Sequence, residues 1–375
     1  MRIGFDMLAV QSPHHGHRGI GRYSRDLVRA VLMRDDGHEY VLYAHAALPS
    51  EQIPTSPNAL TRVIGPDSRR GEVRVGQYLD RLTRENPDDL DALVVLSPFE
   101  HWEGYQPPVP EPGGPRLATV IYDTIPFLAP EQFYAPRSMP RFYRVLESLR
   151  RYDVLLAISE ATRADTTALL EVPGDRVVNI SAACDARVFT PPAGPLCEAD
   201  RRTLRLLGIT RPFVLNVGGM DARKNPWGLI DAFAQLPGDL SLTHQLVFAF
   251  RLSPEAARKL REYAERRGVG DSVVVMGEAD DRQLHVLYQR CAVYAFPSTY
   301  EGFGLPLLEA LSSGAPVVAG NNSSQPEVVG DAGLLADASS PADFAAKLGR
   351  VLGDPALAAD LRSRAVAQAA NFSWE

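Results

Sequence analysis

Short apolar runs alternate with amphipathic helical patterns along the whole chain, and this alternation constrains the fold more than any other feature. In the N-terminal half the apolar runs lie at 2–6, 40–44, 92–96, 117–122 and 154–158. The alternation restarts after a segment rich in proline and glycine at 188–195. Buried strands joined by helices form parallel sheets that are covered on both faces, so each half predicts a Rossmann-like α/β domain.

The linker divides the 375 residues into an N-terminal domain, 1–190, and a C-terminal domain, 191–375. We expect the two domains to face one another across an interdomain cleft. Ligands of parallel sheets bind at the carboxyl ends of the strands, so the loops that follow strands are the places to search for chemistry.

Composition and charge exclude several classes of protein. The net charge of −7 argues against a nucleic-acid partner, which would require a basic surface. No apolar run approaches the roughly 20 residues of a membrane-spanning helix, and the N-terminus lacks the apolar region of a signal peptide, so we expect a cytoplasmic protein. The three cysteines have no metal-like spacing and imply no disulfide framework.

A glycine-rich segment at 18–23 follows the first strand region and opens a helix predicted over 21–33. Its residues Gly19, Ile20 and Gly21 let the backbone approach a ligand, and a helix N-terminus attracts anions. A tight turn that packs the helix on the strand explains the same residues equally well.

A second loop joins two glycines to a basic pair. Gly218 and Gly219 end a strand at 213–217, and Arg223 and Lys224 precede a helix predicted to be capped by Asn225. Only three of the 39 basic residues are lysines, so a lysine here indicates a requirement for a compact ammonium group. Because cations are unfavourable beside a helix N-terminus, we favour a bound diphosphate over a solvated charge pair.

The third loop carries two carboxylates around a helix start. Glu301 lies on the loop after the strand at 293–296, and Glu309 lies about one turn into the following helix. The N–H groups of Phe303, Gly304 and Leu305 lie at that helix start and can bind an anion. Glu309 can accept hydrogen bonds from ribose hydroxyls, and Glu301 from those of a second sugar.

These motifs together resemble the retaining glycosyltransferases of family four, the "glycosyl transferases group 1" with the GT-B fold, and the likeness covers nearly the whole chain. The resemblance rests on the segment from Glu301 to Glu309, on Gly218-Gly219 and on Arg223-Lys224-Asn225. The segments 19–23, 121–126 and 159–160 resemble N-terminal motifs of the same family. Two segments depart from the family. Tyr122 stands where a histidine is usual, and residues 182–185 read Ala-Ala-Cys-Asp where Asn-Gly-Val-Asp is usual.

The resemblance implies a role for each matching residue. Arg223 and Lys224 would bind the donor diphosphate, with Gly19 to Gly21 closing on it from the other domain. Glu309 would bind the ribose, Glu301 the donor sugar, and the loop with Glu278 the base. Gly302 to Leu305 would lie near the sugar and phosphates. Asp123 would act on the acceptor side.

The implied reaction is the transfer of a hexose, with retention, from a nucleotide diphosphate-sugar to a glycan or lipid-linked acceptor in polysaccharide biosynthesis. Mannose from GDP-mannose is the preferred donor on overall likeness. Such an enzyme needs neither a metal nor a cofactor, because helix N-termini and basic side chains neutralise the diphosphate. Alternatives are a nucleotide-sugar 2-epimerase and a non-catalytic sugar-binding module of a larger polymerase.

Three further expectations concern the surroundings of this site. The cluster His14, His15 and His17 suggests a metal, but we favour a polar loop beside the acceptor pocket. The segment 137–151 alternates arginines with apolar residues, which fits a helix on the inner face of the membrane or, as we favour, one packed on its sheet. The segment 371–375 resembles one that precedes a last helix, so we expect a longer protein.

Overall fold

The computed structural model describes residues 1–12, 16, 19–64, 75–99, 107–125, 139–185 and 187–374. The chain forms two compact units, residues 1–182 with Trp374, and Ala183–Ser373. The division falls shortly before the predicted boundary at 190, because the intervening residues pack in the second unit. The Phe189 ring contacts Tyr288 edge-on at 5.9 Å, and the Gln289 side chain donates to the Thr190 carbonyl.

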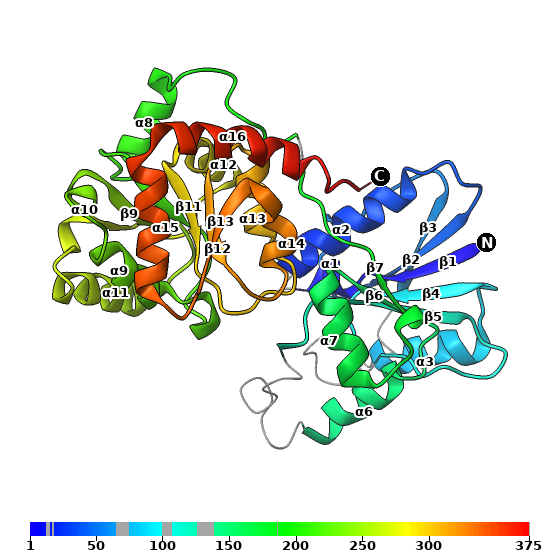
Figure 1. Ribbon diagram of the computed structural model, residues 1–375. Helices are drawn as coiled ribbons and strands as arrows, with labels where there is room; N and C mark the ends of the chain where they lie inside the picture. The colour runs from blue at the N-terminus through cyan, green and yellow to red at the C-terminus, as the bar shows by residue number, and fades with distance from the viewer. Residues whose placement is uncertain are drawn as a thin grey trace. The chain divides into compact units, whose positions relative to one another are not determined.

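Unit 1 contains a seven-stranded sheet with the order β3-β2-β1-β4-β5-β6-β7, in which every neighbouring pair is parallel. Its strands are β1 (Arg2–Asp6), β2 (Glu39–His45), β3 (Ala59–Ile64), β4 (Ala92–Val95), β5 (Arg116–Ile121), β6 (Val154–Ala157) and β7 (Val177–Asn179). Five of them match the predicted strands, whereas β3 and β7 were not predicted. Its described helices are α1 (Leu8–Gln11), α2 (Gly19–Leu32), α3 (Val75–Glu85), α6 (Met139–Leu149) and α7 (Glu160–Leu170) (Figure 1).

The helices α6 and α7 of unit 1 confirm two predictions. The helix α6 buries Phe142, Val145 and Leu149, so the segment packs on its sheet as we favoured. The helix α7 begins after Ser159, whose hydroxyl accepts from the Thr162 N–H as an N-cap.

Unit 2 repeats the same design. Its sheet has the order β10-β9-β8-β11-β12-β13, again parallel throughout. The strands are β8 (Phe213–Asn216), β9 (Gln245–Phe248), β10 (Val273–Val275), β11 (Val293–Phe296), β12 (Val317–Gly320) and β13 (Gly333–Ala336). The helices are α8 (Glu198–Leu206), α9 (Pro226–Ala234), α10 (Leu240–Thr243), α11 (Pro254–Arg266), α12 (Asp281–Arg290), α13 (Leu305–Ser312), α14 (Gln325–Val329), α15 (Pro341–Gly353) and α16 (Pro355–Ala369).

The strand order reverses direction at β8. From β8 the chain runs outward through β9 to β10, and it then returns to place β11 on the other side of β8. Since crossover connections are right-handed, this reversal puts α9 and α13 on opposite faces of the sheet. The loops after the neighbouring strands β8 and β11 leave the sheet at the same edge, the place where such sheets bind ligands. The two motif loops predicted to bind the donor are these loops.

One predicted helix proved to be two. The tail predicted as a single helical segment over 341–371 divides at Asp354 into α15 and α16. The Asp354 side chain accepts from the N–H groups of Ala356 and Leu357, and Pro355 occupies the first helical position.

Candidate functional site

The basic pair lies directly beside the first of the two carboxylates. Lys224 Nζ is 2.6 Å from Glu301 Oε1, and Arg223 Nη1 is 2.9 Å from Glu301 Oε2. Arg223 Nη1 also donates to the Tyr300 carbonyl at 3.2 Å. Residues that are 77 and 78 positions apart in sequence therefore meet where the strand order reverses, beyond the carboxyl ends of β8 and β11.

Local structure fixes each of these side chains. Arg223 and Lys224 lie in a 3-10 turn, η3 (Ala222–Lys224), and the Asp221 side chain caps this turn by accepting from the Arg223 N–H. The next residue, Asn225, accepts from the Gly228 N–H and caps α9 as predicted. The Thr299 N–H donates to the Arg223 carbonyl at 2.7 Å and so joins the two loops through their backbones.

The charges of this cluster are balanced. Glu301 is only 6% exposed, and burial alone would raise its pKa. The charges of Lys224 and Arg223 outweigh burial and hold the pKa of Glu301 below its ordinary value, so the carboxylate is ionised. Asp221, 3.3 Å from Arg223 Nε, supplies a second negative charge that the sequence had not indicated. Two cations therefore face two anions.

The second carboxylate, Glu309, is held from the neighbouring helix. Glu309 is 7% exposed on α13, and its Oε2 accepts from the Tyr288 hydroxyl of α12 at 3.0 Å. Tyr288 is fully buried and packs edge-on against Phe189 and Tyr294. No sequence pattern distinguished Tyr288 from an ordinary core residue.

The start of α13 has donors without acceptors. Gly304 is the N-cap of α13 and has a φ of 96°. Within the described part of the chain, the N–H groups of Phe303, Gly304 and Leu305 donate to no protein atom. These are the three N–H groups that the sequence predicted to be available for an anion.

The glycines after β8 differ in their surroundings. A Cβ built on Gly218 would lie 3.4 Å from the Asn216 side chain, whereas one on Gly219 would meet nothing within 4 Å. The fold around Gly219 therefore does not itself require a glycine, and the close approach of a ligand predicted for this loop stays a prediction.

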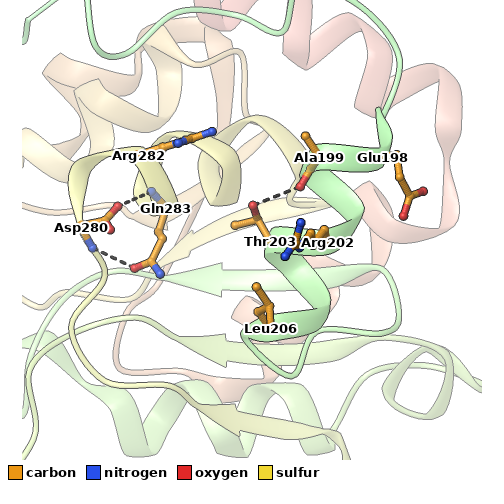
Figure 2. Close-up of a pocket in the computed structure, with 8 residues that line it drawn as sticks. All are labelled: Glu198, Ala199, Arg202, Thr203, Leu206, Asp280, Arg282 and Gln283. Atoms are coloured by element: carbon orange, nitrogen blue, oxygen red, sulfur yellow. Dashed lines mark hydrogen bonds between the residues drawn. The ribbon is translucent and has the colours of Figure 1, made fainter.

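Glu278, predicted to lie in the base-binding loop, is exposed. Figure 2 shows the adjacent pocket between α8 and the start of α12, which Arg202, Leu206 and Asp280 help to line and Glu278 does not. The dashed lines between Asp280 and Gln283 in Figure 2 mark their reciprocal hydrogen bonds, which cap α12. The side chains of these two residues thus serve as the N-terminal cap of α12.

The remaining predicted residues lie in unit 1. The helix predicted over 21–33 is α2, which begins two residues earlier than predicted, so Gly19 and Ile20 lie with Gly21 in its first turn and not in a loop. The chain is already helical at Gly19, where a side chain would meet nothing within 4 Å. Asp123 follows β5, and its Oδ1 accepts from the Ile125 N–H at 3.0 Å. The contacts predicted for these four residues with donor or acceptor stay predictions.

The histidines His14, His15 and His17 lie outside the described residues. Among the residues that the structure does describe, no group of three or more His, Cys, Asp or Glu side chains could hold a metal ion. No helix in the described ranges has the length and apolar character needed to cross a bilayer.

The chain is similar to known proteins over nearly its whole length. The family model "Glycosyl transferases group 1" matches residues 205–369, which contain both motif loops. The "O-antigen chain mannosyltransferase B" of Escherichia coli is 32% identical over 372 residues, covering 95% of this chain and 93% of that protein. The chain belongs to the group 1 glycosyl transferases.

This glycosyl transferase is also similar to longer proteins. It is 28% identical over 394 residues to the "Serotype-specific mannosyltransferase WbdA" of Escherichia coli, and it spans 46% of that relative's length. The solved Anabaena Alr3699/HepE, in complex with UDP and glucose, has a TM-score of 0.70 and 19% identity, covering 100% of this chain and 96% of the other. The structural neighbours have the GT-B fold, and this glycosyl transferase shares it.

Proposed function

We propose that the protein transfers a hexose from a nucleotide diphosphate-sugar to a glycan or lipid-linked acceptor, with mannose from GDP-mannose as the favoured donor. The observation that carries this proposal is the cluster of Arg223, Lys224 and Glu301 beside the N–H donors at the start of α13. The names of the Escherichia coli relatives, both mannosyltransferases, support mannose as the sugar.

The donor is assigned to unit 2, part by part. The diphosphate accepts from Arg223, Lys224 and the N–H groups at the start of α13, which supply both charge and helix dipole. Glu309, oriented by Tyr288, accepts from the ribose hydroxyls. Solved HepE holds UDP and glucose, which is a ligand set of this kind.

Glu301 has a double role in this proposal. Its two oxygens pair with Lys224 and Arg223, but a carboxylate offers about four lone-pair sites, so it can also accept from sugar hydroxyls. When the diphosphate arrives, the two cations are shared between phosphate and Glu301. The loop with Gly219 allows close approach, and the loop with Glu278 is assigned to the base.

We propose retention by front-face substitution. The bond from the anomeric carbon to the diphosphate oxygen breaks, and the acceptor oxygen bonds to the same face of that carbon. The acceptor proton passes to an oxygen of the leaving phosphate, while Arg223 and Lys224 stabilise the developing charge. Asp123 orients the acceptor. Since Glu301 is held by two cations, it is poorly suited to act as a nucleophile.

A panel of nucleotide sugars tests the function directly. GDP-mannose should raise the melting temperature most and should be turned over with a mannoside acceptor, and NMR of the product should show the donor's anomeric configuration. Release of an epimerised sugar in the absence of acceptor would favour the epimerase. If no nucleotide sugar raises the melting temperature, the proposal is overturned. A hexose found on Asp123 or Glu301 by mass spectrometry would replace front-face substitution by double displacement.

A further inference from the structure

A loop outside the donor motifs holds the loop that carries Glu301. This second loop follows β12 and includes Ser323 and Ser324. The Glu301 N–H donates to Ser323 Oγ at 2.9 Å. Ser324 Oγ lies 3.0 Å from the Glu301 carbonyl and 2.9 Å from the Phe303 carbonyl, and its one proton is shared between them. The backbone around Glu301 is therefore fixed by two consecutive serines.

Both serines have features that point to a specific task. Ser324 is fully buried and stands at the N-cap of α14, yet its hydroxyl makes no capping hydrogen bond with that helix. Ser323 has a φ of 47°, a left-handed conformation that residues other than glycine rarely adopt. The Ser324 hydroxyl thus bonds to the Glu301 loop in place of capping α14, and Ser323 has a strained backbone at the position where it contacts the same loop.

The hydrogen bond to the Phe303 carbonyl determines where the next N–H points. A trans peptide unit is planar, and its C=O and N–H point in opposite directions. Because Ser324 holds the Phe303 carbonyl, the Gly304 N–H is directed away from Ser324. Gly304 is buried and its N–H has no acceptor among the described residues, which is uncommon for a buried backbone donor.

We infer that Ser324 is a positioning residue for phosphate binding: by holding the Phe303 carbonyl, it aims the Gly304 N–H at the donor diphosphate. This inference rests on the proposed function, which assigns a diphosphate to the start of α13. Ser324 does not touch the donor itself. Without its hydroxyl, the peptide unit between Phe303 and Gly304 loses its fixed orientation, and the Phe303 carbonyl loses its partner.

The test compares Ser324→Ala with Ser313→Ala. Ser313 is equally buried in unit 2, but its hydroxyl has no hydrogen-bond partner among the described residues, so the control removes the same atom without an interaction. Affinities for GDP and for inorganic pyrophosphate are measured by calorimetry. Ser324→Ala should weaken both by about tenfold, the equivalent of one well-placed hydrogen bond, and Ser313→Ala should leave both unchanged. The KM for donor should rise, and the KM for acceptor should not.

Hydrogen exchange of the wild-type protein gives a second readout that does not depend on a variant's folding. Pyrophosphate should slow exchange in the peptide that contains Gly304. Wild-type protein that binds pyrophosphate without protecting this peptide, or a folded Ser324→Ala protein with unchanged affinity, overturns the inference and leaves the proposed function standing. Wild-type protein that binds neither GDP nor pyrophosphate overturns the proposed function first.

Discussion

Lys224 differs from the other two lysines of the chain in its interaction partners. Lys259 is exposed on α11 and pairs with Glu255 one turn away, and Lys347 on α15 lies 4.0 Å from Asp343. Lys224 instead reaches a buried carboxylate on another loop and lies 5.3 Å from the Phe296 ring centroid. The Lys224 ammonium is therefore fixed beside Glu301, in the loop predicted to bind the diphosphate.

Replacing Lys224 by alanine should therefore weaken donor binding. Loss of a charged partner from a bound diphosphate should cost about 2–5 kcal/mol, measured by calorimetry with GDP-mannose. Lys259→Ala is the matched control and should bind the donor like the wild type. Unchanged affinity of Lys224→Ala would show that the phosphate assignment is wrong.

Glu309 should decide between ribose and deoxyribose. The carboxylate accepts from the ribose hydroxyls in the proposed complex, and a buried hydroxyl without a partner costs about 1–3 kcal/mol. Glu309→Ala should thus lose the preference for GDP over 2′-deoxy-GDP in competition binding. Equal loss of affinity for both nucleotides would point to a structural role for Glu309 with Tyr288.

Acid should remove the stability that Glu301 supplies. The pKa of Glu301 is lower in the folded protein than its ordinary value of 4.5, so the folded state favours the ionised form. The stabilisation is fully present above pH 4.5 and disappears as the pH falls through the folded pKa. As the pH falls below 4.5, the free energy of unfolding should therefore decrease less in Glu301→Gln than in the wild type, as measured by urea denaturation. Parallel pH profiles would contradict the pairing with Lys224 and Arg223.

At the scale of elements, the start of α13 depends on one glycine. Gly304 has a φ of 96°, and a Cβ there would lie 3.2 Å from Leu307 Cδ1. Gly304→Ala should destabilise the fold by at least about 1–2 kcal/mol, seen as a lower melting temperature. Gly219→Ala adds the same methyl group into open space, so it should keep the melting temperature and weaken donor binding. The reverse pattern would refute the assignment of the two glycines.

The elements also show which parts of the fold the sequence could predict. Strands buried on both faces, such as β8 and β11, were predicted because they are continuous apolar runs. The edge strand β3 was missed because four of its six residues are exposed, and β7 because it has three residues. The division at Asp354 had a sequence signal in the following proline, which the helical periodicity on either side outweighed.

The residues of the candidate site could be predicted from the sequence, but the contacts between them could not. Each motif loop could be assigned to phosphate or sugar from its own residues. The pairing of Glu301 with Lys224 required the strand order, which places β8 beside β11 although β9 and β10 lie between them in sequence. Ser324 and Tyr288 act through neighbours on other elements, and no local pattern identifies such residues.

For the whole molecule, the proposed chemistry needs no divalent ion. Arg223, Lys224 and the N-terminus of α13 supply the positive charge that a metal would otherwise bring to the diphosphate. Transfer should therefore survive EDTA, measured as hexose transfer from GDP-mannose with and without chelator. An enzyme silenced by EDTA and restored by Mn²⁺ would instead direct attention to His14, His15 and His17.

The shared strand order has a consequence for synthesis on the ribosome. In both sheets the strand made first, β1 or β8, ends in the interior of the sheet, between a neighbour made next and one made much later. Each nascent sheet can grow on one side of its first strand at once, while the other side waits for β4 or β11. Until then one edge of an apolar strand is open to wrong partners. Unit 1 completes its sheet at Asn179, before Phe213 begins the next one, so the two open edges occur in succession along the nascent chain.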